Sequence, residues 1–175
     1  MTRVQRLGYL SAQNSMFFLC DVQEKFRFID SFPFFIKNVS KLLLAGKTLN
    51  VPLIVSEQNP SKLGKTVSEL NIDHAMEKFS KTQFSMITPE IKNILDKLDN
   101  VDSIILMGLE SHICVEQTAM DLLSDGKYSV HIATDCILSR STGDLLMALS
   151  RLQNMGCIIS TSENIIFKLL KDKNI

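Results

Sequence analysis

Residues 103–108, Ser-Ile-Ile-Leu-Met-Gly, are the stretch of this sequence that most clearly decides the fold. An uninterrupted apolar run of this length is typical of a strand covered on both faces. The runs at 16–20 and 52–56 have the same character. Further strands are predicted at 76–79, 128–133 and 157–160.

Segments with helical periodicity separate these strands. In residues 31–50, for example, apolar side chains recur at helical spacing and predict an amphipathic helix. The other predicted helices cover 89–98, 112–124, 144–154 and 162–171, whereas 57–73 is polar and predicted to be a loop. Such alternation favours a mostly parallel sheet with helices on both faces. We therefore expect one doubly wound, Rossmann-like α/β domain over residues 1–175, with five or six strands.

The composition argues against several classes of partner. Lys plus Arg equal Asp plus Glu at 19 each, so no net field favours nucleic acid. No apolar run approaches the roughly 20 residues of a membrane span. The four cysteines lie far apart without a Cys-x-x-Cys pair, which indicates reduced thiols and a cytoplasmic protein. Arg3 and Arg6, in an acid-free segment over residues 1–14, leave a mitochondrial location as the alternative.

Two chemically useful side chains follow predicted strands. In a doubly wound sheet of order 3-2-1-4-5, ligands bind at the carboxyl ends of the first and fourth strands, where the strand order reverses. Asp21 follows the first strand directly, and residues 108–115 lead from the fourth strand into a helix that contains Cys114. We therefore expect a carboxylate and a thiol to face each other across one crevice.

Cys114 is predicted to lie in the first turn of its helix. Unpaired N–H groups and the helix dipole favour a thiolate there, and could also bind a developing oxyanion. Cys20, Cys136 and Cys157 lie in or beside apolar strands and are interpreted as inert core thiols. For Asp21 the alternative role is a cap on the loop after its strand.

The residues of this crevice carry a resemblance to a known family. The stretches FLCDVQEKF (18–26), FSKTQFSM (79–86) and GLESHICV (108–115) occur in the expected order. With them the chain resembles the isochorismatase-like cysteine hydrolases, which include nicotinamidases and N-carbamoylsarcosine amidohydrolases. Residues 56–60 and 63–66 make it most similar to the animal isochorismatase-domain-containing proteins.

The resemblance implies a catalytic trio of Asp21, Lys81 and Cys114. The acid would act as general base toward the thiol, the lysine would support both, and the thiol would attack a carbonyl or nitrile carbon. Periodicity alone does not select Lys81, and a surface role is its alternative. The resemblance also implies a cis peptide at Leu109–Glu110, an oxyanion hole made by the N–H groups of Glu110 and Cys114, and a homo-oligomer (dimer, tetramer or larger).

Two departures from the family's patterns narrow the expected activity. Nicotinamidases bind a metal with an Asp-x-His motif where this chain has Ser56-Glu57-Gln58, and its three histidines are widely spaced. We therefore expect no metal and no other cofactor, and nicotinamide is disfavoured as substrate. True isochorismatases cleave a vinyl ether and lack the cysteine at position 114, so the family name does not give the activity.

Four further residues are candidates for the pocket wall: Gln23, Phe26, Gln58 and Phe84. They follow strand ends or members of the trio, although core packing explains the two phenylalanines equally well. His112 precedes Cys114 by two residues, so the two side chains would point to different sides of the helix. We interpret His112 as a surface or loop-packing residue.

The sequence therefore predicts a metal-independent cysteine hydrolase that acts on a small amide or related carbonyl compound through a thioester at Cys114. The alternative is a binding or scaffold protein that keeps the fold without turnover. A nucleotide-binding Rossmann protein is disfavoured, because the turn at 21–24, Asp-Val-Gln-Glu, lacks the Gly-x-Gly-x-x-Gly fingerprint.

Overall fold

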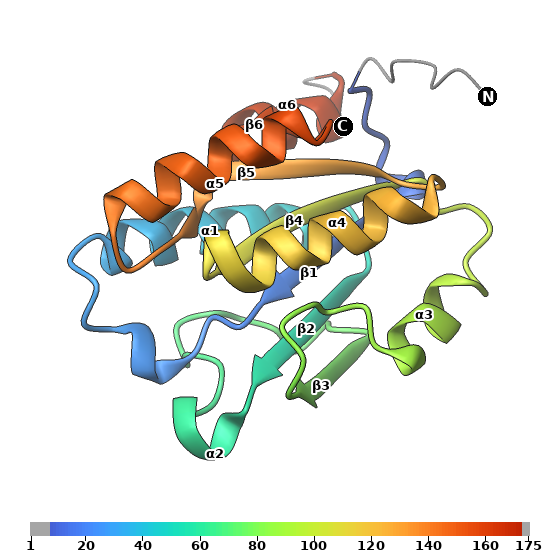
Figure 1. Cartoon of the computed structure of the whole chain (residues 1–175). Coiled ribbons are helices and arrows are strands. Elements are labelled where there is room, and N and C mark those ends of the chain that lie inside the picture. The colour runs from blue at the N-terminus through green and yellow to red at the C-terminus, as the bar shows by residue number, and fades with distance from the viewer. Residues whose placement is uncertain (1–7, 173–175) are drawn as a thin grey trace.

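A computed structural model describes residues 8–172; the predictions made for residues 1–7, including Arg3 and Arg6, lie outside this part of the chain. Six strands form one sheet in the order β3-β2-β1-β4-β5-β6, and neighbouring strands are parallel throughout (Figure 1). The predicted α/β class and the order 3-2-1-4-5 are confirmed, with a sixth strand beside the fifth. The strands are β1 (Ser15–Cys20), β2 (Leu53–Gln58), β3 (Glu77–Lys81), β4 (Ser103–Leu109), β5 (Ser129–Leu138) and β6 (Ile158–Ser160).

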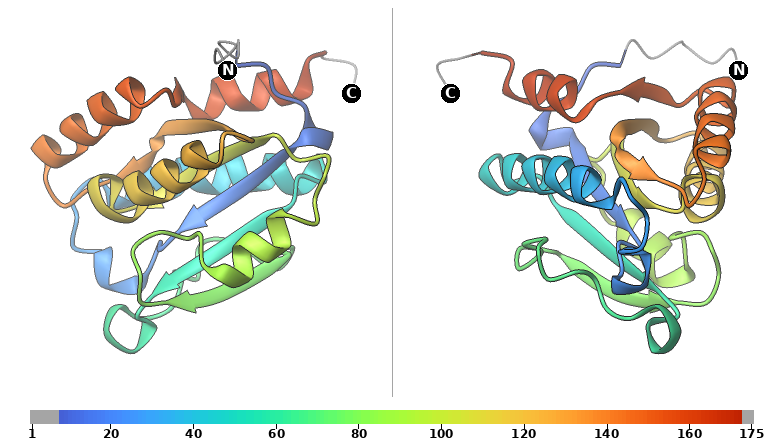
Figure 2. Two further views of the ribbon diagram at one scale, coloured as in Figure 1. Left: turned by 45° about the vertical axis from the view of Figure 1, so that its right-hand side comes forward. Right: turned by 90° about the vertical axis from the view of Figure 1, so that its left-hand side faces the viewer.

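Helices cover both faces of the sheet. The right-hand view of Figure 2 shows α1 on one side of the sheet and α4 and α5 on the other. The core residues divide in the same way, with α1 and α6 contributing to one apolar cluster and α3, α4 and α5 to the other. The helices are α1 (Phe32–Thr48), α2 (Pro60–Leu63), α3 (Pro89–Leu95), α4 (Glu116–Asp125), α5 (Thr142–Asn154) and α6 (Ser162–Leu170). Short helical turns are η1 (Ala12–Asn14), η2 (Glu24–Phe26) and η3 (Ser111–Val115), the last a π-helical turn.

The central strand β1 shows why its sequence is apolar at every position. Phe17 and Leu19 pack into one cluster, and Met16 and Phe18 into the other. All four side chains are fully buried, because successive residues of a strand point to opposite faces and both faces are covered. Within residues 8–172, no helix is both long enough and apolar enough to span a bilayer.

The structure differs most from the sequence prediction at three elements. The predicted loop 57–73 contains the four-residue helix α2, which starts at Pro60 and is followed by Gly64 at φ 80°. Helix α3 ends at Leu95, three residues before the predicted end. Strand β5 continues to Leu138 because it pairs with β4 through Leu109, a long-range contact that local periodicity does not encode.

Gly108 allows β4 to approach β1 closely at the carboxyl ends of the strands. It pairs with Cys20 and has φ 133°, a value that L side chains rarely adopt. A Cβ atom at this position would lie 2.0 Å from the carbonyl oxygen of Cys20. The close approach therefore requires glycine.

We expect Gly108→Ala to lower the free energy of unfolding by roughly 3 kcal/mol, because backbone atoms must move to admit the methyl group. Urea denaturation measures this loss. Gly143→Ala is the matched control, since its Cβ would meet nothing closer than 3.8 Å. Equal stability of the two variants would contradict the prediction.

His131, in β5, is a fully buried polar side chain. Neither of its ring nitrogens has a hydrogen-bond partner within the described residues. Burial, reinforced by the positive charge of Lys168 and opposed by Asp102, lowers the pKa of His131 to about 4. The neutral imidazole is therefore the form that the fold accommodates.

This burial predicts a loss of stability in acid. The unfolded chain, with an ordinary histidine pKa near 6.5, binds a proton before the folded chain does. The stabilising effect of neutral His131 is thus complete above about pH 6.5 and is lost as the pH falls toward 4. Between pH 7 and pH 4 we expect the wild type to lose about 3 kcal/mol more than His131→Leu in urea denaturation. Parallel pH profiles for the two proteins would contradict this.

Candidate active site

The carboxyl ends of three neighbouring strands bring the predicted acid and lysine together. In the parallel register Cys20 of β1 lies beside Ser56 of β2, and Gln58 of β2 lies beside Lys81 of β3. Asp21 comes directly after β1 with φ 52°, in the left-handed region that aspartate tolerates better than most residues. This turn is a local backbone cost of the kind often found at functional sites.

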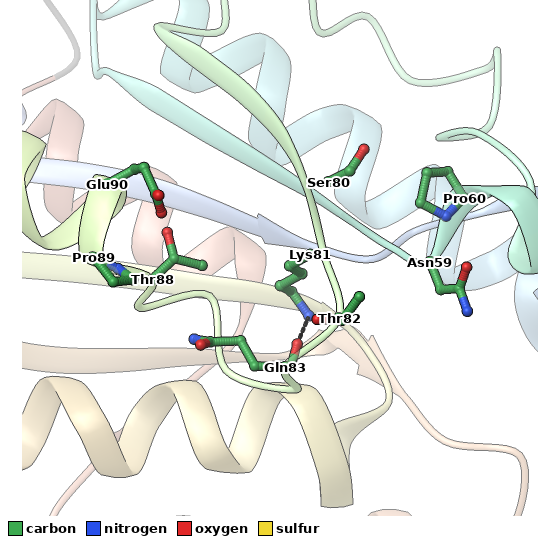
Figure 3. A pocket seen from close by; sticks show the side chains of 9 residues that line it. All are labelled: Asn59, Pro60, Ser80, Lys81, Thr82, Gln83, Thr88, Pro89 and Glu90. Carbon is green, nitrogen blue, oxygen red and sulfur yellow. Dashed lines mark hydrogen bonds between the residues drawn. The ribbon is translucent and has the colours of Figure 1, made fainter.

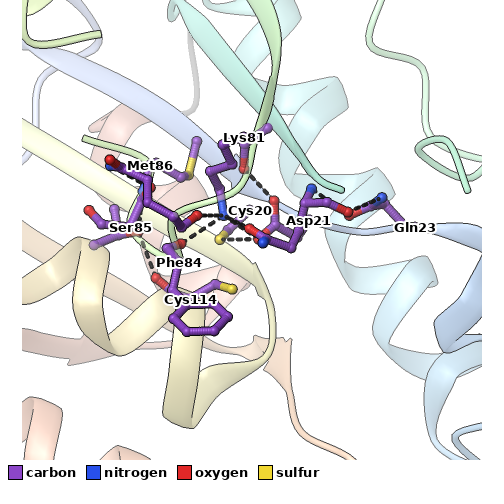
Figure 4. Close-up of polar contacts among 12 residues, drawn as sticks. Cys20, Asp21, Gln23, Lys81, Phe84, Ser85, Met86 and Cys114 are labelled. Carbon is purple, nitrogen blue, oxygen red and sulfur yellow. Dashed lines mark hydrogen bonds and ion pairs between the residues drawn. The ribbon is translucent and has the colours of Figure 1, made fainter. Parts of the chain in front are cut away.

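The carboxylate of Asp21 is almost completely buried and receives three hydrogen bonds. Ser56 Oγ donates to Oδ1 over 2.7 Å. Lys81 Nζ donates to Oδ2 over 2.7 Å, and the Cys20 thiol lies 3.5 Å from the same oxygen (Figure 4). A buried carboxylate requires such partners because its desolvation is costly.

The ammonium group of Lys81 donates hydrogen bonds to oxygen atoms of four residues. Besides Asp21, its ammonium donates to Gln58 Oε1 over 2.9 Å, to the Phe84 carbonyl over 2.7 Å and to the Gln83 carbonyl over 3.3 Å. The ammonium side chain has no exposed surface. Lys81 is therefore a fixed, buried charge and not the surface lysine of the alternative interpretation.

Cys114 lies in η3, directly before α4, so the helical run of 111–125 begins three residues before it. It faces a cavity of about 220 Å³ whose wall also includes Asp21. The cavity is lined by Asp21, Phe26, Gln58, Leu63, Phe84, Leu109, Glu110, Ile113, Cys114 and Arg140. The predicted carboxylate and thiol thus share one crevice, as the strand order requires.

Cys20 does not line this cavity, but its thiol contacts Asp21, which does. Burial, the neighbouring Cys114 thiol and the charge of Asp21 together raise the pKa of the Cys20 thiol well above its usual range. The thiol therefore stays protonated and can donate its hydrogen to Asp21. Burial likewise raises the pKa of Cys136, and neither Cys20 nor Cys136 lines the cavity.

Of the four predicted wall residues, the structure brings three to the cavity: Phe26, Gln58 and Phe84. Gln23 does not line it. Its buried side-chain amide donates to the carbonyls of Gln58 and Gly64 and accepts from the Gln58 N–H over 2.8 Å. Gln23 instead holds the loop after β2 against the turn after β1.

Charged groups stand at the rim of the cavity. The Leu109–Glu110 peptide bond is cis, at the position that the resemblance implies. The buried Glu110 carboxylate forms an ion pair with Arg140, whose Nε lies 2.8 Å from one oxygen, and His112 Nε2 lies 3.5 Å from the other oxygen. His112 also contacts Ser139 Oγ at 3.0 Å. His112 thus has the loop-packing contacts expected for it and is not among the residues that line the cavity.

A second, larger and more open cavity lies beside Lys81 (Figure 3). It measures about 380 Å³ and is lined mainly by the residues that flank β3 and the start of α3. Neither Asp21 nor Cys114 contributes to it. The smaller cavity is therefore the one that joins the thiol to the carboxylate.

At the position of the nicotinamidase metal motif, Ser56 is bonded to Asp21 and Gln58 to Lys81. Glu57 accepts from the N–H and hydroxyl of Thr66 and pairs with Lys78 over 2.9 Å. Although burial raises the pKa of Glu57, these partners lower it overall. Over residues 8–172, no group of three His, Cys, Asp or Glu side chains is arranged to bind a metal ion.

Sequence reasoning missed the roles of several residues around this site. From the sequence, Ser56 was noted only because it stands where nicotinamidases have a metal ligand, and Cys20 was interpreted as an inert core thiol. Arg140, at the rim, lies 26 positions after Cys114, and nothing in its local sequence points to the cavity. The one available signal was position, because Cys20 ends β1 at the switch point and Ser56 ends the neighbouring predicted strand over residues 52–56.

Comparison with known proteins agrees with this geometry. Residues 15–164 match the sequence profile of the Isochorismatase domain. The chain is 43% identical over 173 residues to isochorismatase domain-containing protein 2 of Xenopus laevis, covering 98% of this chain and 83% of that protein. It is also 43% identical to isochorismatase domain-containing protein 1 of Danio rerio, covering 97% of this chain and 60% of the relative.

Solved structures share the same fold. The MAR1 ribonuclease from Caenorhabditis elegans superimposes with a TM-score of 0.87 at 38% identity, covering 95% of this chain and 86% of that one. The YcaC gene product of Escherichia coli, described as an octameric hydrolase of unknown specificity, gives 0.84 at 19% identity, covering 98% and 86%. At that identity the second likeness concerns the fold alone. With its sheet order, its crevice and the match over residues 15–164, this chain belongs to the isochorismatase domain family.

Proposed function

We propose that this protein is a cysteine hydrolase that cleaves a small amide, or a related carbonyl compound, through a thioester at Cys114. The observation that carries the proposal is the shared cavity: a thiol at the start of a helix and a fixed carboxylate form parts of one wall. Nucleophilic catalysis needs such a thiol and a base to take its proton.

The proposed reaction assigns roles to Asp21, Lys81 and Cys114 and to backbone N–H groups of the site. Asp21 accepts the thiol proton, and the Cys114 sulfur then forms a bond to the substrate carbonyl carbon. N–H groups at Glu110 and Cys114 bind the resulting oxyanion, which lies at the start of the helical run. The amine leaves with the proton, and a water molecule cleaves the thioester to release the acid and restore the thiol. Lys81 balances the charge of Asp21 and fixes its position over 2.7 Å.

The cavity limits the substrate that we propose. Its volume of about 220 Å³ is below the roughly 300–1,000 Å³ of sites for drug-sized ligands. Most of its wall is apolar, from Phe26, Leu63, Phe84, Leu109 and Ile113. We infer a small amide with a compact apolar substituent, with its carbonyl directed toward Cys114.

Two other functions give different outcomes in the same assays. The name of the C. elegans relative suggests RNA as a substrate, but a net charge of zero and an apolar cavity do not favour a polyanion. A scaffold role would leave the site without turnover. The homo-oligomer implied by the family resemblance stays a prediction, for which the octameric E. coli hydrolase is a fold-level precedent.

We expect iodoacetamide to label Cys114 at least roughly tenfold faster than Cys20 and Cys136, since those two thiols are fully buried and have a raised pKa. Peptide mapping by mass spectrometry after timed labelling of the folded protein measures the rates. Cys114→Ala is the control for the assignment of the modified peptide. Equal rates at all four cysteines would remove the basis of the proposed function.

Turnover is tested with a panel of small amides and esters graded by the size of the apolar substituent, with a short RNA included. We expect release of acid from at least one small amide, and a loss of at least roughly 100-fold in Cys114→Ala. Hydrolysis that survives this substitution would contradict the thioester. Cleavage of RNA alone, or of nothing in the panel, would favour the ribonuclease or the scaffold, respectively.

The buried ion pair predicts a large stability effect. Lys81→Met leaves the Asp21 carboxylate without its charged partner, and we expect a loss of about 3–5 kcal/mol in urea denaturation. The double variant Asp21→Asn with Lys81→Met removes both charges and should recover part of that loss. A single variant as stable as the wild type would show that the pair does not stabilise the fold.

A further inference from the structure

Thr118 is a buried polar residue close to the site but absent from the proposed chemistry. It lies in α4, four residues after Cys114, and its side chain has no exposed surface. Residues four apart on a helix lie on the same face, so Thr118 lies directly beneath the turn that carries the thiol. It is not among the residues that line the cavity.

The hydroxyl of Thr118 makes two short hydrogen bonds in opposite roles. It donates to the carbonyl oxygen of Cys114 over 2.6 Å and accepts from the backbone N–H of Met86 over 2.9 Å. A hydroxyl that both donates and accepts has a fixed orientation. The Cys114 turn and the segment around Met86 are therefore joined through one oxygen atom.

The same segment also holds the lysine. Residues 82–88 connect β3 to α3, and two of their carbonyls, from Gln83 and Phe84, accept hydrogen bonds from Lys81 Nζ. Phe84 forms part of the cavity wall. Figure 4 shows Phe84 and Met86 close to both Lys81 and Cys114. The segment is thus fixed to the lysine at one end and to the nucleophile's helix at the other.

We propose that Thr118 is a positioning residue that fixes the orientation of Cys114 relative to the Lys81–Asp21 pair. This inference rests on the proposed function, because it concerns the reactivity of the same thiol. Loss of the hydroxyl would leave the Met86 N–H buried without its partner, and the segment would shift to find another. The carbonyl groups that bind Lys81 and the helical turn that carries Cys114 would then no longer be held in a fixed position relative to each other.

The test compares variants by the rate at which iodoacetamide alkylates Cys114 across a pH series. Thr118→Val keeps the shape and removes the hydroxyl, whereas Thr118→Ser keeps the hydroxyl. We expect Thr118→Val to lower the rate at pH 7 roughly tenfold and to move the midpoint of the pH profile of alkylation to higher pH. Thr118→Ser should restore both to near the wild-type values.

Ser162→Ala is the matched control. Ser162 is as deeply buried, and its hydroxyl donates to Asp135 over 2.6 Å, away from the cavity. We expect this variant to be less stable while its Cys114 profile stays unchanged. The control therefore separates a general loss of stability from a change in the orientation of Cys114 relative to Lys81 and Asp21.

A merely structural role for Thr118 predicts that Thr118→Val unfolds more easily but keeps the wild-type profile, and that result would overturn the inference. A fall in rate for Thr118→Ser equal to that for Thr118→Val would overturn it too, since the hydroxyl would then not be the cause. If Thr118→Val does not fold, Thr118→Ala carries the same comparison. Failure of the wild type to label preferentially at Cys114 would instead count against the proposed function.

Discussion

The site is organised around one buried negative charge. The Asp21 carboxylate has almost no access to water, so its folded position is tolerable only where protein donors replace the solvent. Those donors come from the carboxyl ends of β2 and β3 and from the last residue of β1. Parallel pairing brings these strand ends to one edge of the sheet. The hydrogen bonds to the Asp21 carboxylate thus link the ends of three strands beside the cavity.

Cys114 approaches this charge from the other half of the sheet. Strand β4 pairs directly with β1, and the glycine at position 108 allows the two backbones to come together just before the chain turns into η3. The thiol therefore belongs to a helix whose position depends on β4, and the carboxylate to a turn whose position depends on β1. Their meeting is a property of the β1–β4 pairing, as expected at the point where the strand order reverses.

The polar groups of the site also differ in what they can do. Cys20 and Lys81 are enclosed, and their contacts are with protein atoms, so they serve the position and charge of Asp21. Cys114 contributes to the wall of a mostly apolar cavity, where a substrate carbonyl could reach it. This division supports a hydrolase in which one thiol reacts and its neighbours hold the base. The ion pair of Glu110 and Arg140 lines the cavity beside the cis peptide.

The α/β class, the central strands and the proximity of Asp21 to Cys114 could be predicted from the sequence. Apolar runs and helical periodicity are local signals, and the order of the strands indicates where the crevice lies. Lys81 followed from the family resemblance alone, since no local pattern distinguishes it from other lysines. The hydrogen-bond partners of the Asp21 carboxylate could not be predicted in this way, because Ser56 lies 35 residues away in the sequence and Lys81 lies 60. Nor could the sequence predict that Gln23 joins two loops and does not line the cavity, or that Thr118 bonds both to Cys114 and to Met86. Such contacts depend on side-chain directions across strands and helices, which hydrophobic patterning does not encode.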